Sequence, residues 1–190
     1  MAHRDIVVIG ASAGGLQALQ QILSAMPRDV EAALLAVLHT ADHSGSMLPQ
    51  ILQRRSNMPV SHPCDPIQRG RVYIAPPGFH MIVEQGFLRV LQGPRENLHR
   101  PAIEPLFRSA AAAYGRRVIG VILTGMLGDG TAGLMVVSAR AGEAIVSGSG
   151  KRFLSFHAEK CVGSSAECTC TATGPDRGLP VATHWGGAAF

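Results

Sequence analysis

Three side chains that together can carry out acyl transfer follow three apolar segments of this chain. Ser12, His39 and Asp129 come after the apolar residues 6–9, 32–38 and 118–123, respectively. A serine, a histidine and an aspartate can serve as nucleophile, general base and orienting carboxylate. Each is a weak signal alone, because a histidine after a strand and an Asp-Gly turn are commonly structural. Their equivalent placement favours a hydrolytic triad.

The segment around Ser12 predicts a strand, a tight turn and a helix. Residues 6–9 form a continuous apolar run, typical of a strand that is buried on both faces. The glycines at 10, 14 and 15 let the backbone turn sharply, and the turn would hold Ser12 beside amide N–H groups without helical partners. The same turn also suits a bound phosphate. G-A-S-A-G-G matches neither the dinucleotide and P-loop patterns nor G-x-S-x-G, so this stretch alone leaves both interpretations open.

The alternation of strand-like and helical segments predicts an α/β fold. We expect a doubly wound three-layer αβα sandwich with a mostly parallel sheet, and helices over about residues 46–55, 103–114 and 132–140. Residues 71–75, 80–84 and 87–91 are typical of short strands, the last two in a hairpin, and predict an antiparallel insertion or edge. Functional groups collect at the carboxyl ends of such strands. Ser12, His39 and Asp129 are therefore expected to meet there.

The composition is that of an ordinary soluble α/β domain. The 190 residues are 46% hydrophobic and 16% charged, and no apolar run reaches the ~20 residues of a membrane span. The net charge of +4 permits acidic partners, but sparse aromatic residues and the lack of a lysine or arginine run argue against nucleic-acid binding. The chain leads straight into a strand, and its cysteines form no disulfide framework. We expect a cytoplasmic protein with no signal peptide, membrane insertion or cofactor.

Four motifs in order resemble the catalytic domain of the bacterial chemotaxis protein-glutamate methylesterases. They are I-G-A-S-A-G-G at 9–15, V-Y-I-A-P-P-G-F-H at 72–80, G-P-R-E-N-L-H-R-P at 93–101 and V-I-L-T-G-M-L-G-D-G at 121–130. The strand that ends in His39 fits the same family. The resemblance runs from about residue 6 to residue 146, and several separate motifs in the right order make it specific.

This resemblance implies an activity and a set of site residues. The family removes methyl groups from glutamyl methyl esters of chemoreceptor helices, and deamidates receptor glutamines, through an acyl-enzyme. The implied roles are catalytic for Ser12, His39 and Asp129, oxyanion binding for the Ala13 and Met126 amides, and substrate binding for His99 and Arg100. The alternatives are an anion-binding or nucleotide-binding α/β module and a catalytically silent receptor-binding protein.

Control of the activity is expected to differ from that of the family. Members usually carry an N-terminal phosphoacceptor receiver domain, whereas this chain begins at the catalytic strand. We therefore expect that control is absent or is supplied in trans by a receiver domain or a methyltransferase. The receptor helices remain the expected substrate partner.

The other titratable residues are expected to have lesser roles. His80, at a strand start, is expected at the surface or against substrate. Glu84 and Glu104 are expected to be solvated. Thr124 is expected to hold the Asp129 loop by a hydrogen bond.

The resemblance stops near Ser147, which divides the chain into a catalytic domain at 1–146 and an atypical tail at 147–190. Ser147 to Cys161 can be encoded so that a shift of one base reads Q-D-P-E-S-A-F-F-P-S-M-P-R-N-A, similar to the family's segment there. We predict a frameshifted, loosely packed tail that lacks the family's last strand and helix, with weaker stability and activity. Cys161, Cys168 and Cys170 lack the paired spacing of structural zinc, so no metal site is predicted.

Overall fold

The computed structural model describes residues 4–12, 14–39, 47–63, 66–124, 128–147 and 153–156. Strands and helices alternate along most of this chain, as the hydrophobic pattern predicts. The elements are β1 (Ile6–Ala11), α1 (Gly15–Ala25), β2 (Ala33–Leu38), α2 (Leu48–Gln53), β3 (Val60–Ser61), β4 (Arg71–Ile74), β5 (His80–Glu84), β6 (Phe87–Leu91), α3 (Ile103–Tyr114), a 3₁₀ turn (Gly115–Arg117), β7 (Val118–Thr124), α4 (Thr131–Ala139), β8 (Glu143–Ser147) and β9 (Phe153–Phe156).

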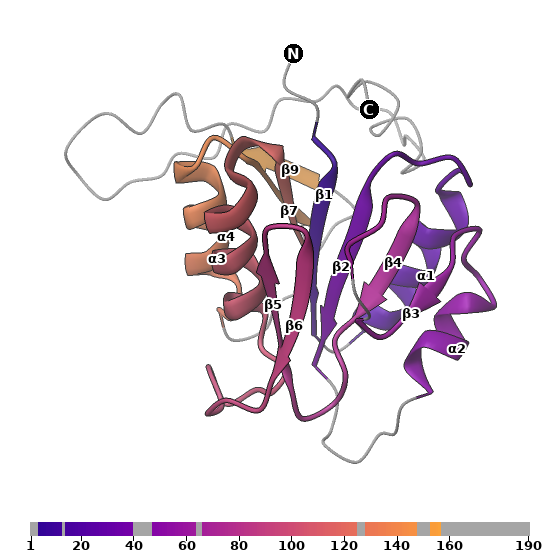
Figure 1. The fold of residues 1–190 in the computed structure, drawn as a ribbon, viewed down its shortest axis with the longest axis horizontal. Helices are drawn as coiled ribbons and strands as arrows, with labels where there is room; N and C mark the ends of the chain where they lie inside the picture. The colour runs from indigo at the N-terminus through magenta and orange to yellow at the C-terminus, as the bar shows by residue number, and fades with distance from the viewer. Residues whose placement is uncertain are drawn as a thin grey trace.

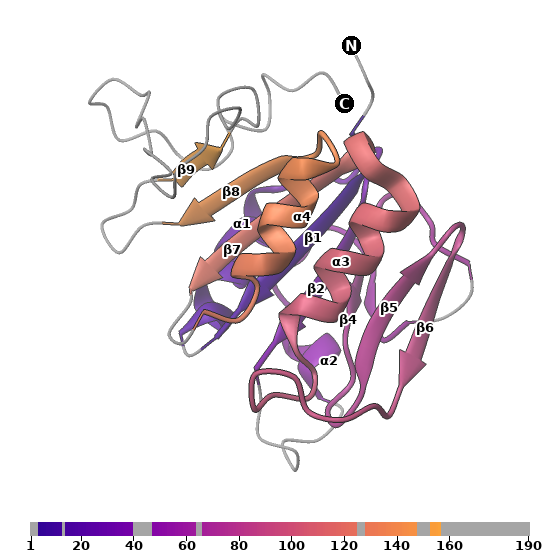
Figure 2. The ribbon, with the colours of Figure 1, turned by 90° about the vertical axis from the view of Figure 1, so that its left-hand side faces the viewer.

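One sheet of seven strands, in the order β3-β4-β2-β1-β7-β8-β9, forms the middle layer. Every pair from β3 to β8 is parallel, and β9 pairs with β8 in the antiparallel direction. Helices α3 and α4 cover one face of the sheet, and α1 and α2 cover the other (Figures 1 and 2). The predicted doubly wound, three-layer αβα sandwich with a mostly parallel sheet is therefore confirmed.

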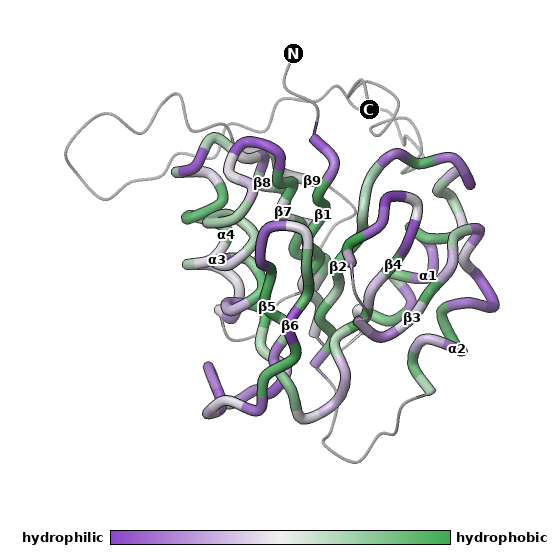
Figure 3. The backbone as a smooth tube through the Cα atoms, in the orientation of Figure 1, coloured by the Kyte–Doolittle hydropathy of each residue, from purple (hydrophilic) through white to green (hydrophobic). Residues whose placement is uncertain are grey.

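The central strand β1 is buried on both faces, which explains its unbroken apolar sequence. Ile6 and Val8 pack into the cluster under α3 and α4. Val7 and Ile9 pack into the cluster under α1 and α2. The hydropathy colouring shows the same apolar centre flanked by polar loops (Figure 3). Burial on both faces fixes the register of β1, because a slip of one residue would exchange its two packed sets.

The antiparallel part of the structure is smaller than the sequence predicts. β5 and β6 form the expected hairpin, a separate two-stranded sheet beside α3. The sequence groups residues 71–75 with this hairpin, but β4 instead joins the main sheet as a parallel partner of β2. Its side chains from Val72 to Ile74 are buried, which only a central position provides.

Most of the predicted tail lies outside the described residues. Its one described element is β9, which extends the sheet beyond β8. The proposed frameshift and loose packing of residues 147–190 stay a prediction. Within the described part of the chain, none of the helices has both the length and the apolar character needed to cross a bilayer.

The direction in which the chain winds reverses between β1 and β7. β1 is followed by α1 on one face, whereas β7 is followed by α4 on the other. Loops that diverge in this way leave a crevice at the carboxyl ends of the strands. The pairing of β1 with β7 also shifts between Gly10 and Ala11, so that Ala11 lies opposite Thr124. Such a bulge redirects the chain that leaves the strand.

A close approach between α3 and β1 brings the start of α3 to this edge. A Cβ at Gly10 would lie 2.5 Å from Ile103 Cγ2, and a Cβ at Gly130 would lie 2.8 Å from the same atom. Ile103 is buried, with 1% of its surface exposed. The two glycines thus leave the space in which the first residue of α3 is seated.

Replacing Gly10 by alanine tests this contact. We expect Gly10→Ala to lower the free energy of unfolding in urea by about 1–3 kcal/mol, because the branched Ile103 side chain has no room to withdraw. Gly120→Ala on β7 is a matched control, since its Cβ would meet Leu134 Cδ1, the flexible end of a side chain, at 2.8 Å. Gly120→Ala should lower the free energy of unfolding by less than Gly10→Ala does. A Gly10→Ala protein as stable as the parent would contradict this seating of α3.

Candidate active site

Ser12 and His39 follow neighbouring strands at the same edge of the sheet. Ala11 lies opposite Leu38 in the parallel pairing of β1 with β2. The His39 N–H continues that ladder and donates to the Ala11 carbonyl at 3.0 Å. Because neighbouring strands run about 4.8 Å apart, the two residues that follow lie side by side. The Ser12 carbonyl accepts the Gly15 N–H at 2.9 Å, which closes the turn into α1.

Asp129 reaches His39 from the loop between β7 and α4. Nε2 of His39 lies 2.7 Å from Oδ2 of Asp129. The side chains are 9% and 1% exposed, so this contact is almost free of water. An ionised carboxylate only accepts hydrogen bonds, so Nε2 carries the proton in this contact. The structure thus brings together the three residues that the sequence predicts as a triad.

The N-terminus of α3 holds the Asp129 carboxylate. The Ile103 N–H donates to Oδ2 at 2.8 Å, and the Glu104 N–H approaches Oδ1 at 3.4 Å. The side-chain amide of Asn97 donates to Oδ1 at 2.9 Å. Burial raises the pKa of Asp129, but the hydrogen bonds from His39, Ile103 and Asn97 outweigh it and lower the pKa to about 2. Asp129 is therefore ionised throughout the neutral range.

Glu104 binds the N-terminus of α4 in the reverse direction. Its Oε1 accepts the N–H groups of Gly130 and Ala132, both at 3.0 Å. A Cβ at Gly133 would lie 2.8 Å from Oε2, so this glycine leaves room for the carboxylate. Glu104 is 4% exposed, and the expectation that it is solvated is wrong. Sequence reasoning missed its role, because its partners are backbone groups at the start of another helix.

A tight turn in the loop before α3 places two residues against the triad. Glu96 and His99 exchange backbone hydrogen bonds at 3.1 and 2.9 Å across a two-residue turn. The turn residues Asn97 and Leu98 have φ values of 49° and 69°, a left-handed conformation that non-glycine residues rarely adopt. Asn97 uses this conformation to reach Asp129. Leu98 is left 81% exposed beside the site.

His99 stacks on His39. The ring centroids are 3.6 Å apart and the planes differ by 10°. Nε2 of His99 is buried and has no hydrogen-bond partner among the described residues. The sequence predicts substrate binding for His99, and that role stays a prediction.

His80 and Arg100 fasten this loop from behind. Nε2 of His80 donates to the Pro94 carbonyl at 2.7 Å, and Nδ1 accepts the Ala102 N–H at 3.3 Å. Nη1 of Arg100 donates to the Gly93 carbonyl at 2.9 Å, so part of its guanidinium group is engaged in a hydrogen bond within the loop. His80 is 4% exposed, and the expectation of a surface or substrate-contacting residue is wrong.

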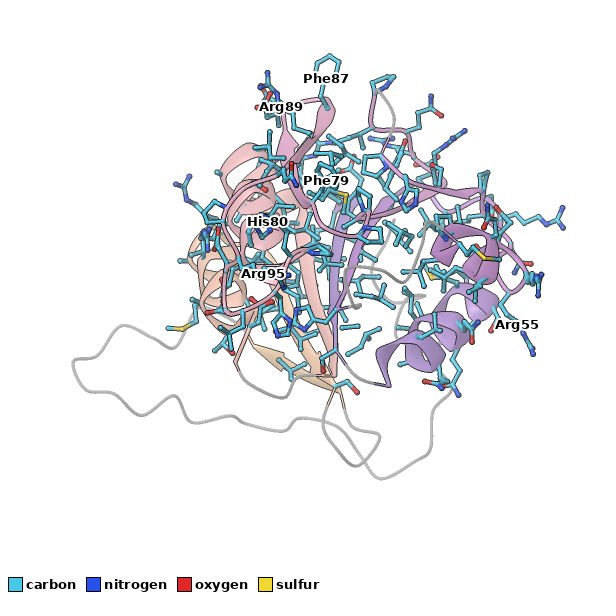
Figure 4. All side chains as sticks on the ribbon, turned by 90° about the horizontal axis from the view of Figure 1, so that it is seen from below. Arg55, Phe79, His80, Phe87, Arg89 and Arg95 are labelled. Atoms are coloured by element: carbon cyan, nitrogen blue, oxygen red, sulfur yellow. The ribbon has the colours of Figure 1, made fainter. Side chains whose placement is uncertain are left out.

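The view onto the carboxyl edge shows how the loop lies relative to its surroundings. Figure 4 labels His80, Phe79 and Arg95 on the side of the β5–β6 hairpin, where Phe87 and Arg89 also lie, and Arg55 on the opposite side. The loop residue Arg95 thus lies on the side of the β5–β6 hairpin, away from Arg55, which follows α2.

The remaining expectations concern residues at the margins of the site. Ala13 and Met126, the predicted oxyanion amides, lie outside the described residues, and so does the side chain of Thr124. Glu84 is exposed and pairs with Arg89 at 3.0 Å, as expected of a solvated carboxylate. The part of the chain that the structure describes holds no group of three or more residues suited to bind a metal ion.

The low pKa of Asp129 predicts how stability changes with pH. The folded pKa of about 2 lies below the usual aspartate value of about 3.9, so the carboxylate adds stability above that value and loses it as the pH falls toward 2. The contribution is about 2.5 kcal/mol. Most of this contribution is gone at pH 2.5, so urea unfolding at pH 7 and at pH 2.5 should show the parent losing about 2 kcal/mol more stability than Asp129→Asn. Equal losses in the two proteins would contradict the assignment.

Comparison with known proteins places this arrangement in a family. The family model for CheB methylesterase matches residues 7–151. A protein-glutamate methylesterase/protein-glutamine glutaminase 2 of Anaeromyxobacter dehalogenans is 42% identical over 143 residues, which are 74% of this chain and 42% of that protein. A protein of the same name, numbered 1, from Rhodospirillum rubrum is 38% identical over 149 residues, which are 74% of this chain and 38% of that protein. The chain thus spans about two fifths of the length of these relatives.

A solved structure agrees with the sequence comparison. The crystal structure of the Thermotoga maritima CheB methylesterase catalytic domain superimposes with a TM-score of 0.70 at 33% identity. The alignment covers 76% of this chain and 79% of that one. The chain therefore belongs to the CheB methylesterase family.

Proposed function

We propose that this chain hydrolyses glutamyl methyl esters of chemoreceptors, and deamidates receptor glutamines, through an acyl-enzyme on Ser12. The observation that carries this proposal is the row of Ser12, His39 and buried Asp129 at one edge of the sheet. The names of the relatives, protein-glutamate methylesterase/protein-glutamine glutaminase, support the substrate class. An anion-binding module would leave the His39–Asp129 pair without a purpose.

In the first half of the reaction Ser12 Oγ attacks the ester carbonyl. His39 takes the hydroxyl proton, and it does so through Nδ1, because Nε2 is bound to Asp129. The negative charge that develops on the carbonyl oxygen is received by the amides of Ala13 and Met126. The proton on Nδ1 then passes to the leaving oxygen, and methanol departs. A glutamine side chain would lose ammonia in the same way.

In the second half water releases the glutamate. His39 Nδ1 removes a proton from the water that attacks the acyl group, and returns that proton to Ser12 Oγ. Asp129 stays ionised in both halves, since its pKa is about 2. Its charge stabilises the imidazolium form of His39 each time that form appears.

The loop before α3 lies beside the triad and carries the exposed Leu98. Arg100 on this loop is proposed to contact the receptor helix; the family resemblance implies such a contact for His99 as well. A cytoplasmic location is consistent with substrates on the cytoplasmic helices of receptors.

Loss of the Ser12 hydroxyl tests the proposal. Ser12→Ala should lower methanol release from a methylated receptor fragment by about 10⁴-fold or more, because the nucleophile itself is removed. Ser24→Ala on α1 is the matched control, since Ser24 is exposed and its hydroxyl donates to the Gln21 carbonyl of the same helix. It should match the parent. Methanol release by Ser12→Ala at the parent's rate would rule out this mechanism.

A further inference from the structure

The contact between His39 and His99 bears on how the general base is oriented. The hydrogen bond from Nε2 to Asp129 fixes one atom of the His39 ring. A bond at one atom still allows the ring plane to swivel. Acceptance of the Ser12 proton at Nδ1 requires that plane to be aligned with Ser12, since hydrogen bonds weaken steeply away from linearity. A second restraint on the ring is therefore needed.

The parallel ring of His99, at 3.6 Å, supplies such a restraint. The stretch of the loop that precedes His99 is itself held in place by three contacts. Arg108 of α3 binds Glu96 at 2.8 Å, Asn97 binds Asp129, and His80 binds the carbonyl of Pro94. The left-handed turn that presents His99 is thus anchored to three separate elements.

We propose that His99 is a positioning residue, whose ring face sets the plane of His39 so that Nδ1 points at Ser12. This inference rests on the proposed function, because it assigns a role to His99 within that reaction. It differs from the substrate contact that the family resemblance implies.

The charges around His99 suit this role. Burial lowers the pKa of His99, the charge of His39 lowers it further, Asp129 opposes this by raising it, and Arg95 lowers it again. The result is a pKa below the usual range for histidine, so His99 is neutral at neutral pH. A neutral ring can stay stacked when His39 gains the proton, whereas a charged ring would repel it.

Three substitutions of His99 distinguish a role of its ring face from a role of its polar ring nitrogens. His99→Phe keeps a flat ring and removes both nitrogens. His99→Gln keeps a polar end at the place of Nε2 and removes the ring. His99→Ala removes both. Thermal unfolding of each variant shows whether the loop has stayed folded.

Two esters complete the test: a methylated receptor fragment and p-nitrophenyl acetate, which is too small to need a receptor contact. With both, we expect His99→Ala and His99→Gln to lower kcat by about tenfold or more with KM little changed, because misplacement by 1 Å can cost about 10²-fold. His99→Phe should stay within a few fold of the parent.

Each other result overturns the inference. Equal kcat values for the parent and all three variants would remove any role for the ring. Recovery by glutamine but not by phenylalanine, seen only with the receptor fragment, would assign His99 to substrate binding. If the parent itself hydrolyses neither ester at a rate above Ser12→Ala, the proposed function fails together with the inference.

Discussion

The binding of the Asp129 carboxylate at the N-terminus of α3 is the interaction on which the rest of this site depends. An isolated carboxylate buried this deeply would be costly. Here it receives the Ile103 N–H, the Asn97 amide and His39, and it remains ionised. The Asp129 carboxylate thus connects the sheet, helix α3 and the loop that precedes α3. Movement of α3 by a fraction of an ångström would alter the position of His39.

The same two helices exchange a second contact in the opposite direction. Asp129 precedes α4 and binds the start of α3, whereas Glu104 begins α3 and binds the start of α4. Each carboxylate meets the positive end of the partner helix, where N–H groups lack helical acceptors. The reciprocal arrangement fixes the distance between the two helix starts. It also explains the small residues there, because Gly130 leaves room for Ile103 and Gly133 leaves room for Glu104.

Local patterns in the sequence predicted most of the strands and the places of Ser12, His39 and Asp129, whereas β3 and β9 were not predicted. Ser12, His39 and Asp129 could be found because each follows a buried strand, and parallel strands bring their carboxyl ends together. The burial of Glu104 and His80 could not be found in this way. Their partners are backbone groups of distant segments, Gly130 and Ala132 for one and Pro94 for the other. A backbone group is present at every residue, so a residue pattern does not show which backbone groups bind a given side chain. A polar side chain with such partners is therefore predicted to be solvated.

The position of the proton on His39 tests the central claim most directly. Nitrogen NMR of histidine-labelled protein at pH 8, assigned with a His39→Gln variant, distinguishes protonated from unprotonated ring nitrogens. The bond to Asp129 predicts that Nε2 of His39 is protonated and that Nδ1 is unprotonated, free to accept the proton of Ser12. In Asp129→Asn this preference should be lost. A parent protein in which Nδ1 carries the proton would contradict the account, because no base would then face the serine.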